Sequence, residues 1–182
     1  MTERNTREYG KSIYLWLAVS AVLLIVFDQL MKYAAVVSLK DKPARVLIKG
    51  VLELRYLENR GAAFGMLQNA WIVFIVITAV FVAISLYFVL RVPKNRHYLP
   101  LIIAFTFLFS GAIGNFIDRV SHRYVVDFIY FSIIDFPIFN VADIYVTLSV
   151  IAIFIMILFR YKDKEMSFLF GSNSKSDEND PN

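Results

Sequence analysis

The stretch FSGAIGNFIDRVSHRYVVDFIYFSIIDFPIFNVAD, residues 109–143, decides how this chain folds. It lies between two long apolar runs and holds two asparagines and four aspartates: Asn115, Asn140, Asp118, Asp127, Asp135 and Asp143. Carboxylates at the edge of a membrane are costly to hold there, so these side chains are candidates for a functional site. The other segments are then expected to position them.

The composition is that of an integral membrane protein. Of the 182 residues 58% are hydrophobic and the mean hydropathy is +0.59, which is too apolar for an ordinary soluble domain. The formal charge of +4 could suit a nucleic acid, but the basic residues lie in loops beside apolar runs and favour an anionic lipid surface. Thiol chemistry is excluded because the chain has no cysteine, and His97 and His122 are too few for a zinc site.

Four apolar segments are long enough to cross a hydrocarbon core of about 30 Å. They are predicted at about residues 13–36, 70–90, 99–117 and 140–160. The first could be a cleavable signal peptide, but it is long, carries its charges late and precedes more spans, which favours a retained helix. Residues 44–66 alternate in the manner of strands and predict a small extended platform outside the bilayer.

The domain organisation follows from these spans. Residues 1–165 are predicted to form a single integral membrane domain, and the polar residues 166–182 a disordered tail. Four spans put both termini on one side, where ten Lys and Arg lie against eight on the other. Because short basic loops such as 91–98 dominate the positive-inside rule, we expect cytoplasmic termini and aspartate-bearing loops near the outer face.

Asp28 and Lys32 interrupt the first apolar run four residues apart, in the order that favours an ion pair on one helix face. One interpretation is an ion pair near the helix end, with the lysine side chain reaching the membrane interface. The other is a direct chemical role for Asp28. The ion pair is the favoured interpretation.

Polar and small residues beyond the first span also admit two interpretations each. Asn59, at the start of NRGAAFG, could contact a peptide ligand or mark a tight turn that re-enters the membrane. Gly111 and Gly114, beside Ser110 and Ala112, present a small-residue surface that either a helix or a substrate could approach closely.

The aspartates have structural explanations beside the catalytic one. Asn140 and Asp143 have the spacing of a helix capping box, and the neighbouring Asp118 and Arg119 could form an interfacial ion pair. Alternatively, an aspartate pair that shares one proton can hydrolyse a peptide bond without a metal. Asp135, in a loop, is expected only to be solvated.

Five sequence blocks match one family in order. They are DQLMK at 28–32, NRGAAFG at 59–65, GAIGNFIDR at 111–119, VVDF at 125–128 and FNVAD at 139–143. With the spans, which together cover about residues 13–160, the chain resembles the lipoprotein signal peptidases (signal peptidase II), a family of membrane aspartic peptidases. It departs from the family at Ser110, where a glycine is usual, and at Arg60, where a small residue is common.

This resemblance implies an all-α membrane protein, a four-transmembrane-helix bundle with a small extracytoplasmic β-cradle. It implies an aspartic endopeptidase, with Asp127 and Asp143 as the catalytic dyad. The enzyme would remove signal peptides from diacylglyceryl-modified prolipoproteins by cutting on the amino side of the lipidated cysteine. Residues that would bind substrate or brace the site are Asn59, Gly61, Asn115, Asp118, Arg119, Asn140 and Ala142, with Asp28 and Lys32 as structural support.

The resemblance also implies the partners. They are the prolipoprotein, membrane lipids and globomycin-type inhibitors, bound by a monomer in the bacterial cytoplasmic membrane, with no nucleic acid, metal or other cofactor. Two other function classes compete with a peptidase. A proton-coupled transporter would need charged residues deep in several helices, and a metal-dependent lipid-head-group transferase would need clustered carboxylate ligands.

Overall fold

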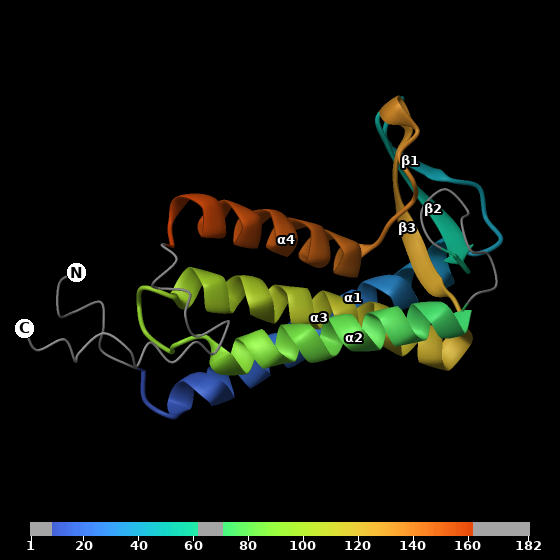
Figure 1. Cartoon of the computed structure of the whole chain (residues 1–182). Coiled ribbons are helices and arrows are strands. Elements are labelled where there is room, and N and C mark those ends of the chain that lie inside the picture. Colours follow the sequence, from blue (N-terminus) through green and yellow to red (C-terminus); the bar gives the residue numbers. More distant parts are fainter. Residues whose placement is uncertain (1–8, 62–70, 162–182) are drawn as a thin grey trace, which may run out of the picture.

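The computed structural model describes residues 9–61 and 71–161. Within them the elements, in chain order, are α1 (Ser12–Leu39), β1 (Arg45–Ile48), β2 (Leu52–Asn59), α2 (Trp71–Arg91), α3 (Leu99–His122), β3 (Val125–Phe131), the short 3-10 helix η3 (Ser132–Ile134) and α4 (Val141–Phe159). The four long helices lie side by side, and the sheet stands at one end of the bundle (Figure 1). The predicted bundle with a small sheet is confirmed.

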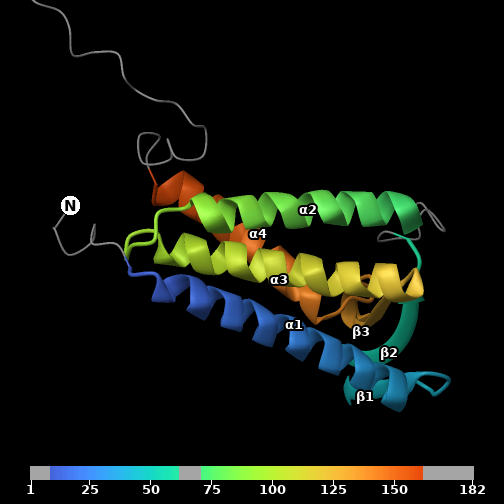
Figure 2. The same ribbon diagram turned by 90° about the horizontal axis from the view of Figure 1, so that it is seen from below.

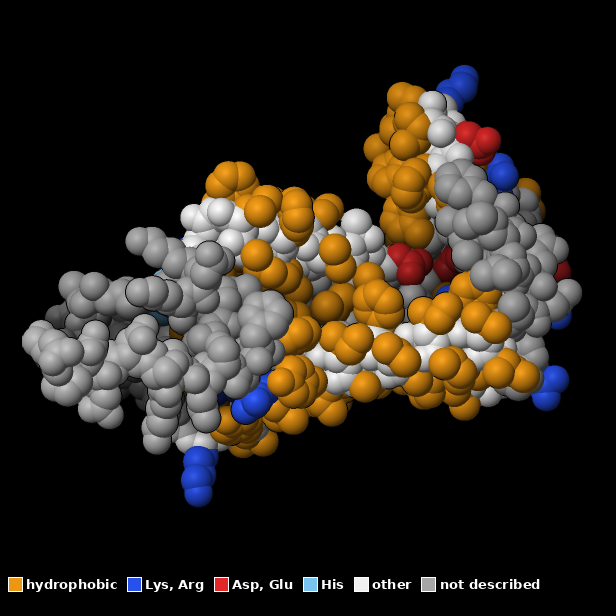
Figure 3. Space-filling view, viewed as in Figure 1, with side chains coloured by type: hydrophobic (Ala, Val, Ile, Leu, Met, Phe, Trp, Pro, Cys, Tyr) orange, Lys and Arg blue, Asp and Glu red, His pale blue; other side chains and the backbone are white. Residues whose placement is uncertain are grey.

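The four long helices are each apolar and long enough to cross a membrane. In α1 and α2 only 6% of the most apolar stretch is buried, whereas in α3 the share is 61%. α3 is therefore the central helix, and it packs against the other three (Figure 2). Hydrophobic side chains cover much of the outer surface of the bundle, as contact with lipid tails requires (Figure 3).

Two glycines allow α3 to approach its neighbours closely. A Cβ atom at Gly111 would lie 2.6 Å from the carbonyl oxygen of Ala142, and one at Gly114 would lie 2.5 Å from Oδ2 of Asp28. Both distances are too short for any side chain. The small-residue surface predicted on the third helix therefore serves helix packing, against α4 at Gly111 and against α1 at Gly114.

The three strands form an antiparallel sheet in the order β1, β2, β3. In the pairing of β2 with β3, Leu57 lies opposite Asp127 and Asn59 lies opposite Val125. Because opposite residues share a face and side chains alternate along a strand, Asn59 and Asp127 are diagonal neighbours on one face. The sheet register thus brings an asparagine to an aspartate that lies 68 residues further along the chain.

Two apolar clusters hold the bundle and the sheet. The first lies at the end away from the sheet: Val92, Tyr98, Leu101, Ile102, Phe105, Leu108 and Tyr161. The second joins α1, β3 and the start of α4: Ala35, Leu39, Val126, Phe128 and Val141. Because Asp127 lies between two members of the second cluster and Asp143 follows a third, this cluster fixes both aspartates relative to each other.

The third helix is longer than its apolar run. The sequence predicts an end at 117, but α3 continues to His122, and Arg123 closes it in the left-handed conformation with φ 67°. Of the predicted cradle at 44–66, the residues beyond Gly61, including Ala62, Ala63, Phe64 and Gly65, lie outside the described residues. The predicted tail at 166–182 lies outside them too.

Candidate active site

A pocket of about 500 Å³ lies where the sheet meets α3 and α4. Its lining residues are Asn59, Gly61, Arg119, Asp127, Phe136, Pro137, Ile138, Phe139, Asp143, Ile144, Thr147 and Leu148. Acidic side chains lie in this hollow, and hydrophobic side chains cover the adjoining face of the sheet (Figure 3). A mostly apolar pocket with a few convergent polar groups is the usual form of a ligand-binding site.

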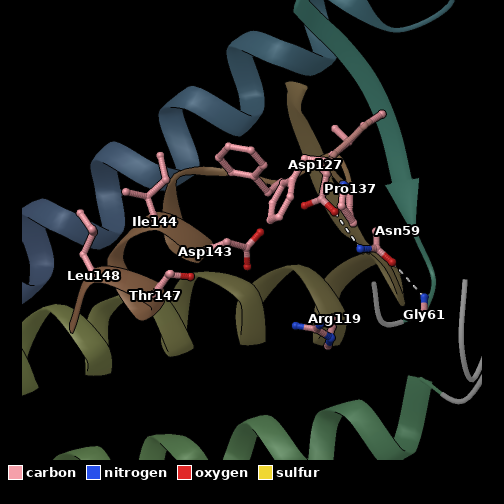
Figure 4. A pocket seen from close by; sticks show the side chains of 12 residues that line it. Asn59, Gly61, Arg119, Asp127, Pro137, Asp143, Ile144, Thr147 and Leu148 are labelled. Carbon is pink, nitrogen blue, oxygen red and sulfur yellow. Dashed lines mark hydrogen bonds between the residues drawn. The ribbon is translucent and has the colours of Figure 1, made fainter. Parts of the chain in front are cut away.

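Asp127 and Asp143 reach this pocket from different elements. Asp127 is on β3 and Asp143 is in the first turn of α4, and their side chains point toward each other (Figure 4). Asp127 is only 1% exposed. Burial, together with the nearby charge of Asp143, raises the pKa of Asp127 to about 7, against the opposing effect of hydrogen bonds from Asn59 and Asn140.

Three asparagines orient the two carboxylates. Asp127 accepts hydrogen bonds from the side-chain amides of Asn59 at 2.7 Å and of Asn140 at 2.6 Å, one on each oxygen. Asp143 accepts one from the side-chain amide of Asn115 at 2.7 Å and one from the backbone N–H of Asn140 at 3.1 Å. Each carboxylate oxygen is thus held by one donor, which fixes the plane of both groups.

The start of α4 is a capping box, as its sequence predicts. The side chain of Asn140 accepts a hydrogen bond from the backbone N–H of Asp143, whose own side chain accepts one from the backbone N–H of Asn140. The cap uses one oxygen of Asp143 and leaves the other for Asn115. Capping and a position in the pocket are therefore compatible, and the cap holds the Asp143 side chain at the pocket wall.

Lys32 is buried beneath the pocket rather than at the membrane interface. Its side chain is 3% exposed, and its ammonium group lies 2.9 Å from Asp28, 3.1 Å from Asp118 and 3.0 Å from the amide oxygen of Asn115. The predicted ion pair with Asp28 is confirmed, whereas the expectation that Lys32 reaches the interface is wrong. Its three N–H donors find three acceptors inside the protein, which compensates for their removal from water.

Asp118 and Arg119 do not form the ion pair that their adjacency suggests. Asp118 pairs with Lys32 and also accepts a hydrogen bond from the backbone N–H of Val126 at 3.1 Å, which ties α3 to β3. Arg119 instead lines the pocket, donates to the carbonyl oxygen of Asn115 at 3.3 Å and lies 5.4 Å from the ring centre of Phe74 on α2.

The remaining predicted residues brace the site or lie away from it. The backbone N–H of Ala142 donates to Asp28 at 2.9 Å, which joins α4 to α1. The backbone N–H of Gly61 donates to the amide oxygen of Asn59 at 3.1 Å, so that its amide nitrogen faces Asp127. Asp135 is exposed, accepts a hydrogen bond from the hydroxyl of Tyr130 at 2.6 Å and does not line the pocket.

Sequence reasoning missed Gln29 and the apolar wall of the pocket. The side-chain amide of Gln29 donates to Asp118 at 3.1 Å and to the carbonyl oxygen of Gly114 at 3.2 Å. Its signal in the sequence is its place beside Asp28 within an apolar run. The wall residues, among them Phe136 and Leu148, have no such signal, because an apolar residue in a membrane protein is unremarkable.

Four helices long and apolar enough to cross a membrane, with the buried Asp127 and the partly buried Asp143 in a pocket between sheet and helices, define an integral membrane enzyme. The family model for signal peptidase (SPase) II matches residues 20–159. The chain is 40% identical over 136 residues to a lipoprotein signal peptidase of Streptococcus pyogenes serotype M1, covering 75% of this chain and 88% of that protein. A lipoprotein signal peptidase of Streptococcus thermophilus (strain CNRZ 1066) is 39% identical over 149 residues, covering 82% and 94%.

A solved structure has the same fold. It is that of a bacterial membrane enzyme determined by the in meso method at 2.3 Å resolution, and it superposes with a TM-score of 0.72 at 34% sequence identity. The match covers 96% of this chain and 99% of that one. The chain therefore belongs to the signal peptidase II family and is a membrane peptidase.

Proposed function

We propose that this chain is an aspartic endopeptidase that removes the signal peptide from diacylglyceryl-modified prolipoproteins. Asp127 and Asp143 are the catalytic dyad, and the cut falls on the amino side of the lipidated cysteine. The observation that carries this proposal is the convergence of two carboxylates, each fixed by two hydrogen bonds, in one largely apolar pocket. The match to lipoprotein signal peptidases supports the substrate class.

The dyad works by sharing one proton. The ionised aspartate takes a proton from a water molecule, which attacks the scissile carbonyl, while the protonated aspartate donates a hydrogen bond to the carbonyl oxygen. Two facing carboxylates resist losing both protons, because the second negative charge would be repelled by the first. The pKa of about 7 at Asp127 supports a pair that keeps one proton near neutral pH.

The pocket wall suits a lipid-linked substrate. Ile144 and Leu148 lie one turn apart on α4 and extend the wall from Asp143 along the helix (Figure 4). Two acyl chains are hard to remove from a bilayer, so the substrate enters sideways from the lipid and leaves its chains there. Globomycin-type inhibitors are expected to occupy the same pocket of a monomeric enzyme.

The orientation of the chain follows from its basic loops and the fold. α1 begins and α4 ends at the end of the bundle opposite the sheet (Figure 1). With both termini in the cytoplasm, as the basic 91–98 loop favours, the sheet and the pocket lie near the outer face.

A transporter fits the charge distribution less well. A proton path across the bilayer would need ionisable groups at several depths. Within the four described spans, the buried charged side chains are Asp28, Lys32 and Asp118, and all of them belong to the network beneath the pocket. The buried charges of the spans are thus gathered at one depth, beside the pocket, rather than spread along a path across the bilayer.

The test is cleavage of a purified diacylglyceryl-modified prolipoprotein, scored by gel shift and by mass spectrometry of the new amino terminus. Asp127→Asn and Asp143→Asn should each abolish cleavage, whereas Asp135→Asn, at an exposed aspartate outside the pocket, should cleave normally. Circular dichroism checks that all three variants are folded. Substantial turnover by both dyad variants would refute the assignment, and loss of activity on strong chelation would favour a metal-dependent reaction instead.

A further inference from the structure

A second pocket, of about 430 Å³, lies at the end of the bundle opposite the sheet. It is formed where α1 begins and where α2 runs into the following loop. Its lining residues are Tyr9, Lys11, Tyr14, Leu90, Arg91, Val92, Pro93 and Lys94. None of them belongs to the site at Asp127 and Asp143, so the peptidase reaction leaves this pocket unexplained.

The charge of this second pocket is positive. Lys11, Arg91 and Lys94 line it together, and none of the described residues that line it is an aspartate or a glutamate. Among the described residues none of these three cations is in an ion pair. Three uncompensated cations around one cavity favour an anionic ligand.

Lys94 gives the strongest indication, because it is a buried cation without a carboxylate beside it in the described part of the chain. It is 6% exposed, and its ammonium group donates to the carbonyl oxygens of Leu90 and Val92. Two of its three N–H groups are thus used, and the ammonium group also lies 5.5 Å from the ring centre of Tyr14, so no anionic group among the described residues neutralises its charge. Burial lowers the pKa of Lys94, and a bound anion would offset that cost. Lys32, the other buried lysine, has two carboxylates for the same purpose.

The start of α1, which lies beside this second pocket, also favours an anionic ligand there. Lys11 is the N-cap of α1 but makes no capping hydrogen bond with its side chain, and Tyr14 is in the first turn. The backbone N–H groups of Ile13 and Tyr14 donate to the carbonyl oxygens of Gly10 and Lys11, but the positive end of the helix dipole still favours an anion beside this terminus. The backbone N–H of Tyr9 donates to the carbonyl oxygen of Lys94 at 2.6 Å, which holds the two walls of the pocket together.

We propose that this pocket binds the phosphate group of an anionic phospholipid. The pocket opens at the end of two spans, where basic pockets between transmembrane helices take lipid head groups. Leu90 is both a lining residue and exposed on the outer surface of α2, and Leu86, one turn earlier, is exposed on the same helix. Acyl chains attached to a bound phosphate would run along these two leucines, a contact that free phosphate would not use.

The experiment measures which lipids the full-length protein retains. The purified protein is equilibrated in mixed micelles with equal amounts of phosphatidylglycerol and phosphatidylcholine, and native mass spectrometry counts the lipids bound. Wild type should retain phosphatidylglycerol in preference. Arg91→Gln and Lys11→Gln, at exposed side chains that leave packing intact, and Lys94→Met, which keeps the apolar stem, should each weaken that preference by about fivefold.

Arg96→Gln is the matched control, because Arg96 is an exposed cation of the same loop that does not line the pocket. It should leave the preference unchanged. Equal retention of the two lipids by wild type, or an unchanged preference in all three lining variants, would overturn the proposal. Displacement of phosphatidylglycerol by inorganic phosphate at comparable concentration would assign the pocket to a free anion and overturn the lipid assignment. The readout does not depend on cleavage, so it stands apart from the peptidase proposal.

Discussion

Replacing Lys32 with methionine tests the buried network beneath the pocket most directly. The substitution keeps an unbranched side chain of similar length but removes the ammonium group that lies 2.9 Å from Asp28 and 3.1 Å from Asp118. Both carboxylates are almost fully buried, at 0% and 3% exposure, so water cannot take the place of the lost cation. The variant therefore leaves two negative charges unpaired inside the protein.

The size of the effect follows from these distances. At about 3 Å, each ion pair has a gross attraction of about 5–6 kcal/mol for an effective dielectric constant of about 20. Part of that attraction offsets the cost of burying the charges in the folded protein. Removing one partner of a buried pair destabilises proteins by about 3–5 kcal/mol, and we expect a loss of that size in the free energy of unfolding of Lys32→Met.

The assay is chemical unfolding of the purified protein in micelles, followed by circular dichroism. Lys40→Met is the matched control, because Lys40 also forms an ion pair, with Glu58 at 3.0 Å, but on the exposed surface, where water screens both charges. It should lose far less stability. Adding Asp28→Asn to Lys32→Met removes one of the two unpaired charges and should restore part of the loss. If Lys32→Met unfolds at the same denaturant concentration as Lys40→Met, the buried network does not stabilise the fold as argued.

Three further predictions concern the pocket and its packing. Folding raises the pKa of Asp127 to about 7, so its contribution to stability should be complete below about pH 4, its unfolded pKa, and should be lost as the pH rises to about 7. The free energy of unfolding, measured at several pH values in this range, should therefore vary less with pH in Asp127→Asn than in wild type. Gly114→Ala should cost about 1–3 kcal/mol in the same unfolding assay, because its methyl group would meet the carboxylate of Asp28, whereas Gly10→Ala, which meets nothing within 4 Å, should be neutral. Asn140→Ser keeps a capping hydroxyl but loses the amide that donates to Asp127, so its cleavage rate should fall at least tenfold while its helix content stays near that of wild type; a cleavage rate equal to that of wild type would mean that Asn140 only caps α4.

The parts of the fold that can be predicted from the sequence are those set by residues close together along the chain. The four spans follow from continuous apolar runs, and the capping box at Asn140 and Asp143 follows from a three-residue spacing that has a local geometric meaning. In each case the partner groups lie within one turn of the chain.

The parts that were mispredicted depend on residues far apart in sequence. The sequence predicts Lys32 at the interface because nothing in it marks Asn115, 83 residues later, as an acceptor for the lysine. The end of α3 lies beyond the predicted residue 117 for a related reason. A polar pair after an apolar run usually signals the end of a span, but here Asp118 is accommodated within the helix by Lys32 and Gln29 from α1.

The contact between Asp28 and Lys32 also bears on how the chain is assembled. α1 is synthesised and placed in the membrane before α3 and α4 exist, and at that stage an isolated charge near its end would oppose insertion. Asp28 and Lys32 are four residues apart on one helix and lie 2.9 Å from each other, so α1 carries its own neutral pair into the bilayer. The same lysine then gains Asn115 and Asp118 once α3 arrives. Lys32, which later joins α1 to α3, thus has a partner for its charge on its own helix from the start of membrane insertion.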